Sequence, residues 1–316
     1  MGRVAPTAKP GQRGGMDALP LLLDWLKPRL GNQPLIIGLA GAQGSGKSTL
    51  AAGLAQRLPG VSGRWPAAGG GDPAAGAIAP PVAVTVSLDD FYLTRARRQA
   101  LAAHIHPLFA TRGPPGTHDL PLLLDALLRV RAGRPVSLPV FDKLADDRLP
   151  PQHWRHFPRI DILILEGWCI GARPQPAALL AEPINDLEAS EDPAAIWRTH
   201  INQALAGTYQ RAWAMLDALA FLAAPDWETV PRWRAQQEAG LTRATGRPGM
   251  DAAAIARFCA HYERLTRWQL ADTPRHAGCT LRLDAQRRVA ALPQTGGKRS
   301  QEKIIRIALA KAMIHS

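Results

Sequence analysis

The segment GAQGSGKS at 41–48 places three glycines, a lysine and a hydroxyl side chain at the spacing GxxxxGK[ST]. Glycines let the backbone turn so that successive N–H groups point at one anion, and Lys47 can reach the terminal phosphates of a nucleotide. The hydroxyl of Ser48 is suited to ligate Mg²⁺. The pattern predicts a P-loop that binds ATP and Mg²⁺ through Gly41, Gln43, Gly44, Ser45, Gly46, Lys47, Ser48 and Thr49.

Carboxylates follow two further β-rich runs. The run 82–87 is followed by Asp89 and Asp90, and the run 161–166 ends in Glu166. Both runs are expected to be buried parallel strands, whose carboxyl ends meet at the edge of the sheet that holds the phosphates. Asp89 could then accept the proton of an attacking hydroxyl or hold magnesium, and Glu166 occupies a Walker B-like place.

These groups define the predicted reaction centre. Lys47, Asp89 and Glu166 are the candidate catalytic residues, and Ser48, Asp89 and Glu166 are the candidate magnesium ligands. A role as the cap of the next helix fits Asp90 better than Asp89, and a functional role is favoured for the pair.

Strands and helices alternate along the rest of the chain. We expect further strands at 35–40, 218–223 and 280–284, and helices at 18–30, 47–58, 194–216 and 250–270. This alternation predicts an α/β fold with a doubly wound, mainly parallel sheet flanked by helices. The expected organisation is a tail and leading helix at 1–34, a main domain at 35–292 with a surface insert at 60–81, and a basic tail at 293–316.

Composition narrows the class of protein. The chain has 316 residues, of which 46% are hydrophobic and 20% charged, and no window has the apolar length of a membrane span. The net charge of +12 comes from scattered arginines without interleaved aromatics, so we expect no nucleic-acid and no membrane partner. Three widely spaced cysteines fit the reducing cytosol, and we expect a soluble, cytoplasmic protein.

Several blocks give the chain a resemblance to a known group. The chain resembles P-loop small-molecule kinases of the uridine kinase, phosphoribulokinase and pantothenate kinase type, and within that group it is most similar to D-glycerate 3-kinases. The resemblance covers about 35–284 and is carried by SLDDFYLT at 87–94, HPLFATRGPPGTHD at 106–119, PVFDKLADDR at 139–148, EGWCIGA at 166–172, PINDLE at 183–188, WRAQQE at 233–238 and HYERLTR at 261–267.

The resemblance implies transfer of the γ-phosphoryl group of ATP to the 3-hydroxyl of D-glycerate, with Asp89 as the base. The small-molecule substrate carries a carboxylate, and Arg112 is the first choice to bind it because its planar fork matches a carboxylate. The substrate-binding candidates are Asp90, Tyr92, Arg112, Thr117, His118, Asp142 and Lys143.

Related kinases place a mobile lid over the phosphates, and the segment PRWRAQQE puts Arg232 and Arg234 in that region. A lid arginine would add positive charge as the phosphoryl group departs and exclude water. Two alternatives stay open at this stage. The acceptor could be a nucleoside, pantothenate or a sugar phosphate, or the chain could be a nucleotide-switched binding module.

Overall fold

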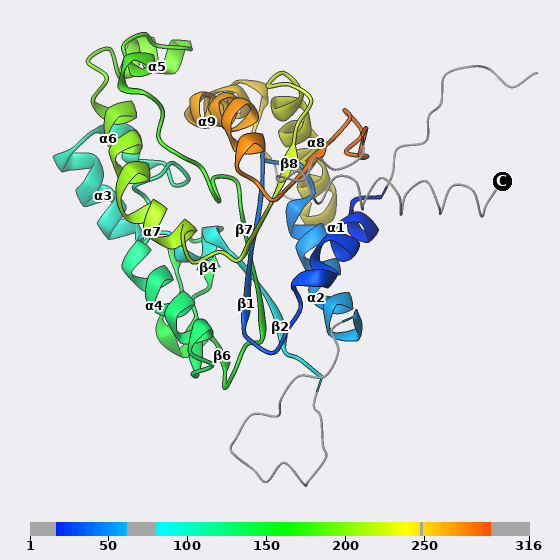
Figure 1. The fold of residues 1–316 in the computed structure, drawn as a ribbon. Coiled ribbons are helices and arrows are strands. Elements are labelled where there is room, and N and C mark those ends of the chain that lie inside the picture. The colour runs from blue at the N-terminus through cyan, green and yellow to red at the C-terminus, as the bar shows by residue number, and fades with distance from the viewer. Residues whose placement is uncertain (1–16, 62–79, 247–248, 292–316) are drawn as a thin grey trace, which may run out of the picture.

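A computed structural model describes residues 17–61, 80–246 and 249–291 (Figure 1). The predicted tails fall largely outside these residues, as do 62–79 of the predicted surface insert. Among the described residues, no helix is long and apolar enough to cross a membrane.

A five-stranded parallel sheet forms the centre of the molecule, in the order β2-β7-β1-β8-β9. Its strands are β1 (Leu35–Gly41), β2 (Ala83–Ser87), β7 (Ile162–Gly167), β8 (Ala218–Ala223) and β9 (Cys279–Arg282). Each coincides within about two residues with a strand predicted from the sequence. The predicted α/β fold with a parallel sheet flanked by helices is therefore confirmed.

The two faces of the sheet carry separate hydrophobic clusters. Ile36 and Ala40 of β1 pack with α4 and α7 on one face, whereas Ile37 and Leu39 pack with α1 and α2 on the other. This alternation is the two-residue period of a strand buried on both sides. Burial of an aliphatic side chain of this size stabilises the fold by about 1.5–3 kcal/mol.

Helices cover both faces (Figure 1). The longer helices are α1 (Ala18–Leu26), α2 (Lys47–Val61), α3 (Arg95–His104), α4 (Leu120–Arg131), α6 (Ile196–Ala204), α8 (Thr229–Thr245) and α9 (Ala252–Asp272). Three of these helices begin at an N-cap aspartate. Asp17, Asp119 and Asp251 are the N-caps of α1, α4 and α9, and each accepts a hydrogen bond from a backbone amide of the first turn.

The helix predicted at 194–216 is interrupted. α6 ends at Ala204, a π-helical turn spans Leu205–Tyr209, and the short helix α7 covers Gln210–Trp213. Gly207 within the turn has non-helical backbone angles of −98° and −113°. Glycine in a helix interior favours such a break because it gains the most freedom by leaving the helix.

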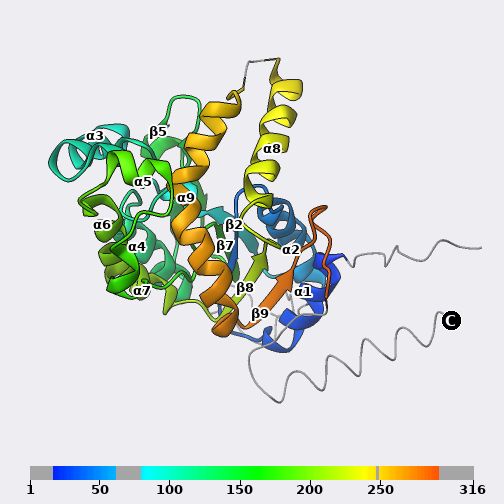
Figure 2. The same cartoon turned by 90° about the horizontal axis from the view of Figure 1, so that it is seen from above.

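Two small antiparallel ribbons were not predicted from the sequence. β3 (Val136–Leu138) pairs with β6 (Arg155–Phe157), and β4 (Phe141–Asp142) pairs with β5 (Asp147–Arg148). The β4–β5 hairpin carries residues 143–146 at its tip. The helices α8 and α9 run side by side (Figure 2).

Candidate active site

The loop between β1 and α2 has the backbone conformation that anion binding requires. Gly44 and Gly46 have φ angles of +72° and +87°, in the left-handed region that strains residues with a Cβ. A Cβ at Gly44 would also lie 2.8 Å from the Cβ of Trp233 on α8. Gly41 ends β1, Ser45 is buried within the loop, and Lys47 begins α2, whose N-terminus favours a phosphate.

A hydrogen bond joins the start of α2 to the end of β7. The Ser48 hydroxyl donates to Glu166 Oε1 at 3.0 Å. Glu166 is 6% exposed, and its Oε2 has no hydrogen-bond partner in the part of the chain that the structure describes. A buried carboxylate oxygen without a partner is unfavourable, and a hard cation would satisfy it.

These two residues fit a magnesium ion shared with a nucleotide. Within the described ranges, no group of three or more His, Cys, Asp or Glu side chains could hold a metal. Mg²⁺ is commonly held by one or two carboxylates together with substrate phosphates and water. Ser48 and Glu166 would supply the protein's share of such a site.

Asp89 lies in η3 (Leu88–Phe91), a 3₁₀ turn directly after β2. Its Oδ1 accepts a hydrogen bond from the Tyr92 hydroxyl at 2.8 Å, and its Oδ2 lies 2.8 Å from Lys143 Nζ. Burial opposes ionisation of Asp89, but Lys143, aided by Lys47, outweighs it and holds the pKa of Asp89 below its ordinary value. The carboxylate is therefore ionised and oriented by two donors.

A cavity of about 160 Å³ separates the P-loop from the β4–β5 hairpin. Ten of the predicted site residues line it: Gln43, Gly44, Lys47, Ser48, Asp89, Tyr92, Arg112, Lys143, Glu166 and Arg234. The phosphate-binding residues therefore share one cavity with Asp89 and with the cations Arg112 and Lys143. The arrangement can hold an anionic acceptor beside a nucleotide.

Sequence reasoning missed five lining residues: Ser87, Trp168, Gln237, Phe258 and Tyr262. Four of them belong to the quoted blocks or directly adjoin one, which was the available signal. Tyr262 also donates to the carbonyl of Arg112 at 3.0 Å, and so helps to fix the backbone of that arginine.

Arg112 pairs with Asp146 at the tip of the β4–β5 hairpin. Asp146 also pairs with the buried Arg98 at 2.9 Å. Burial raises the pKa of Asp146, but the two guanidinium groups outweigh it and hold that pKa below its ordinary value. The hairpin thus positions Arg112, and Asp146 is a site residue that the sequence did not single out.

Four predicted substrate-binding residues are not among those that line the cavity, and three of them bond to the backbone instead. The Asp90 carboxylate accepts from two backbone amides and caps η3. Asp142 accepts from two amides of the hairpin tip. Thr117 closes the preceding turn by accepting from the Gly113 amide at 3.1 Å.

His118 lies behind Tyr92 rather than in the cavity wall. It is 4% exposed, its ring stacks on Tyr92 with centroids 4.7 Å apart, and its Nδ1 is 2.6 Å from the Tyr209 hydroxyl. Burial lowers the pKa of His118 to about 4, although the negative charge of Asp89 opposes the shift. The imidazole is therefore uncharged at neutral pH.

The two predicted lid arginines differ in placement. Arg234 lines the cavity, pairs with Glu238 and lies 4.7 Å from the centroid of the Phe258 ring. Arg232 donates to Thr229 Oγ1 at 2.9 Å and is not among the lining residues. Arg234 is thus the one of the two that the structure brings to the reaction centre.

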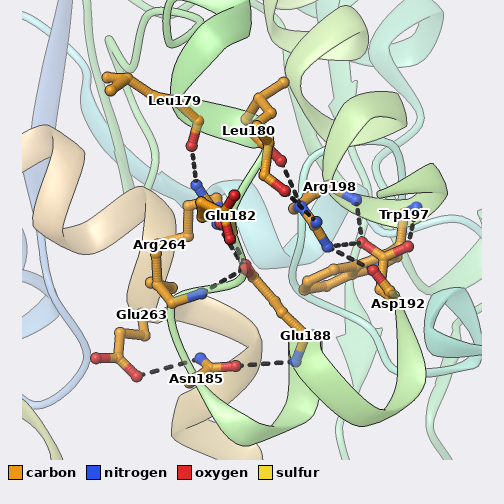
Figure 3. Close-up of polar contacts among 12 residues, drawn as sticks. Leu179, Leu180, Glu182, Asn185, Glu188, Asp192, Trp197, Arg198, Glu263 and Arg264 are labelled. Atoms are coloured by element: carbon orange, nitrogen blue, oxygen red, sulfur yellow. Dashed lines mark hydrogen bonds and ion pairs between the residues drawn. The ribbon is translucent and has the colours of Figure 1, made fainter. Parts of the chain in front are cut away.

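A buried polar cluster lies behind the cavity and explains two of the sequence blocks (Figure 3). Arg264 of α9 binds both carboxylate oxygens of Glu188 on α5 (Asp186–Glu191), at 2.8 and 2.6 Å. Asn185 caps α5 and donates to Glu263 at 3.1 Å. The blocks at 183–188 and 261–267 therefore form one joint between α5 and α9.

No family model matches the sequence. Among known proteins, the uncharacterized kinase mug58 of Schizosaccharomyces pombe is 31% identical over 264 residues, which cover 78% of this chain and 87% of that protein. The chloroplastic D-glycerate 3-kinase of Arabidopsis thaliana is 28% identical over 241 residues, covering 72% of this chain and 46% of that protein. The pantothenate kinase of Nitrobacter hamburgensis is 33% identical over 139 residues, covering 42% and 36%.

Solved structures agree on the fold. The protein YGR205w aligns with a TM-score of 0.64 at 25% identity, over 88% of this chain and 94% of that one. A D-glycerate 3-kinase from Cryptococcus neoformans var. grubii also aligns with a TM-score of 0.64, at 24% identity over 86% and 94%.

Proposed function

This chain belongs to the P-loop small-molecule kinases related to D-glycerate 3-kinase and pantothenate kinase, and on that premise we propose that its acceptor is D-glycerate. The reaction transfers the γ-phosphoryl group of ATP to the 3-hydroxyl, giving 3-phospho-D-glycerate and ADP. The observation that carries the proposal is the cavity that Asp89 shares with the P-loop and with the two cations Arg112 and Lys143.

The size and charge of the cavity favour a small acid. A volume of about 160 Å³ suits an acceptor of few atoms, and Arg112 and Lys143 add two cations to the wall that the P-loop residues share. A glycerate carboxylate bound by Arg112 and Lys143 leaves its hydroxyl groups toward Asp89. A planar guanidinium can bind both oxygens of such a carboxylate at once.

The protein's own groups can carry the proton and the charge. The 3-hydroxyl oxygen attacks the γ-phosphorus, the bond to the β–γ bridging oxygen breaks, and the hydroxyl proton passes to the Asp89 carboxylate. Lys47 and Arg234 line the same cavity and would stabilise negative charge on the phosphoryl oxygens. A magnesium ion held through Ser48 and Glu166 would supply further charge stabilisation when bound.

Pantothenate is a second candidate acceptor. It also carries a carboxylate and a primary hydroxyl, and several bacterial pantothenate kinases match this chain over part of its length. It is a longer molecule than glycerate, and the small cavity favours glycerate over it.

A coupled ADP-release assay with ATP and Mg²⁺ tests the proposal against D-glycerate, L-glycerate, pantothenate, uridine and ribulose 5-phosphate. We expect turnover on D-glycerate, with phosphorus NMR placing the phosphate on the 3-oxygen. Turnover on a different acceptor alone would refute the substrate assignment and leave the nucleotide site intact.

The role of Asp89 has a matched control in Asp125, an exposed carboxylate paired with Arg129 on α4. Asp89→Asn should lower kcat by about 10²–10⁴-fold with little change in ATP affinity, because it removes a proton acceptor. Asp125→Asn should leave kcat unchanged. Near-normal turnover in Asp89→Asn would remove Asp89 from the role of base.

A further inference from the structure

A second cavity, of about 410 Å³, lies on the outer side of the P-loop. It shares Gly44, Lys47, Ser48 and Gln237 with the acceptor cavity, but its wall continues to Gly46 and Thr49. Neither Asp89 nor Glu166 lines it. A triphosphate whose γ end lies toward Asp89 therefore has its α end at Gly46 and Thr49, and its nucleoside half in this outer cavity.

Arg287 lines the outer cavity together with Lys47, and it comes from the turn that follows β9. The turn is closed by hydrogen bonds from the Asp284 amide to the Arg288 carbonyl at 2.8 Å and from the Arg287 amide to the Asp284 carbonyl at 2.9 Å. Arg287 has a φ of +66°, a conformation that costs a residue with a Cβ of the order of 1–3 kcal/mol. Strained residues cluster at ligand sites, and this one places the Arg287 guanidinium beside the P-loop, so we consider which ligand it could bind.

The guanidinium of Arg287 is fixed by two neighbours. Its Nε donates to the carbonyl of Gly44, and its Cζ lies 5.1 Å from the centroid of the Trp233 ring. Trp233 is 1% exposed and donates from Nε1 to the carbonyl of Ala285 at 2.8 Å. The guanidinium thus lies against the indole, and the arginine rather than the indole lines the cavity.

We propose that Arg287 binds the base of the nucleotide by stacking its outer guanidinium face on the purine ring. A planar, permanently charged guanidinium stacks on aromatic rings, and its position on a fixed indole reduces the freedom lost on binding. Gln236 and Gln237 line the same cavity and supply amide groups for the polar edge of the base or the ribose. This inference rests on the nucleotide half of the proposed function and is independent of the acceptor.

The test measures equilibrium binding of MgATP and of magnesium tripolyphosphate, which lacks the nucleoside, by calorimetry. Arg287→Gly removes the side chain and leaves a residue that prefers positive φ, so the turn should keep its shape. Arg287→Lys keeps the charge and removes the planar face. Arg282→Ala, an exposed position on β9, is the control for loss of one positive charge.

If Arg287 stacks on the base, both Arg287 variants should bind MgATP about tenfold or more weakly. Their affinity for tripolyphosphate should change less than twofold, and Arg282→Ala should match the wild type for both ligands. Unchanged MgATP affinity in Arg287→Gly would overturn the inference. Equal losses for both ligands with rescue by Arg287→Lys would also overturn it, since the contact would then be with phosphate. A wild-type chain that binds no MgATP would refute the nucleotide half of the proposed function, and this inference with it.

Discussion

Lys143 Nζ lies 2.8 Å from Asp89 Oδ2, so the β4–β5 hairpin places a cation directly on the candidate base. Arg112, the other cation of the cavity, is paired with Asp146 of the same hairpin. If the acceptor is an acid, as proposed, its carboxylate would take over part of this pairing. The hairpin would then couple the binding of the acid to the freedom of Asp89 to accept a proton.

The pH dependence of activity should respond to Lys143. Lys143 is a principal cause of the lowered pKa of Asp89, whereas burial acts in the opposite direction. Lys143→Met removes the positive charge that lowers the pKa of Asp89, so this pKa should rise. The fall of kcat/KM on the acidic side of its pH profile (the acidic limb) should therefore move to higher pH. Lys27→Met, at an exposed position in the 3₁₀ turn η1 (Lys27–Arg29) and not among the residues that line the cavity, should leave the limb in place. A limb at the same pH in Lys143→Met would show that another group controls it.

The requirement for magnesium should depend on Glu166. Glu166 holds Ser48 through one oxygen, and its other oxygen has no partner in the described structure. Glu166→Gln removes the negative charge and should raise the Mg²⁺ concentration for half-maximal rate by about tenfold or more. Glu228→Gln, at an exposed carboxylate on the edge of α8, serves as the control. An unchanged magnesium titration in Glu166→Gln would exclude Glu166 as a ligand.

The sheet and the P-loop residues of the cavity wall could be predicted because short sequence patterns encode them. Short apolar runs predicted all five strands of the sheet, carboxylates marked the ends of two of them, and the GxxxxGK[ST] spacing predicted the phosphate loop. The β4–β5 hairpin could not be predicted because its strands, Phe141–Asp142 and Asp147–Arg148, have only two residues each. Strands of two residues show no periodicity.

The part of the cavity wall that α9 forms depends on long-range packing. Phe258 and Tyr262 of α9 line it, yet they lie more than 150 residues from the P-loop and follow a helical pattern that reads as ordinary core. Asp90 and Thr117 were expected in the cavity and do not line it. Their residue types suit a polar pocket, but their side chains accept hydrogen bonds from nearby backbone amides instead. Sequence spacing does not decide between these two uses of a polar side chain.

His118 should make stability depend on pH. Its pKa is lowered to about 4 by burial, against about 6.5 in the unfolded chain. The unfolded state therefore binds the proton first as pH falls, and stability that is fully present above pH ~6.5 is lost progressively toward pH ~4. Between pH ~7 and ~4.5, the wild type should lose about 2 kcal/mol more unfolding free energy than His118→Asn, which keeps a polar atom near Nδ1. Denaturant unfolding at the two pH values measures this, and equal losses would mean that His118 is not buried uncharged.

The ion pair between Glu188 and Arg264 should be the most sensitive point of the α5–α9 joint (Figure 3). Glu188 is fully buried, and the Arg264 side chain is 10% exposed. Arg264→Met leaves a buried carboxylate without its charged partner and should cost about 3–5 kcal/mol of unfolding free energy. The double variant Glu188→Leu/Arg264→Met removes both charges and should recover part of that loss.

Arg267 provides the matched control on the same helix. It pairs with Glu263 and Glu228, but its side chain is 48% exposed, so solvent screens the pairs. Arg267→Met should therefore cost less than about 1 kcal/mol. Both measurements come from urea unfolding of the full chain. If Arg264→Met were no more destabilising than Arg267→Met, the charged pair would contribute little, and apolar packing alone would hold α5 against α9.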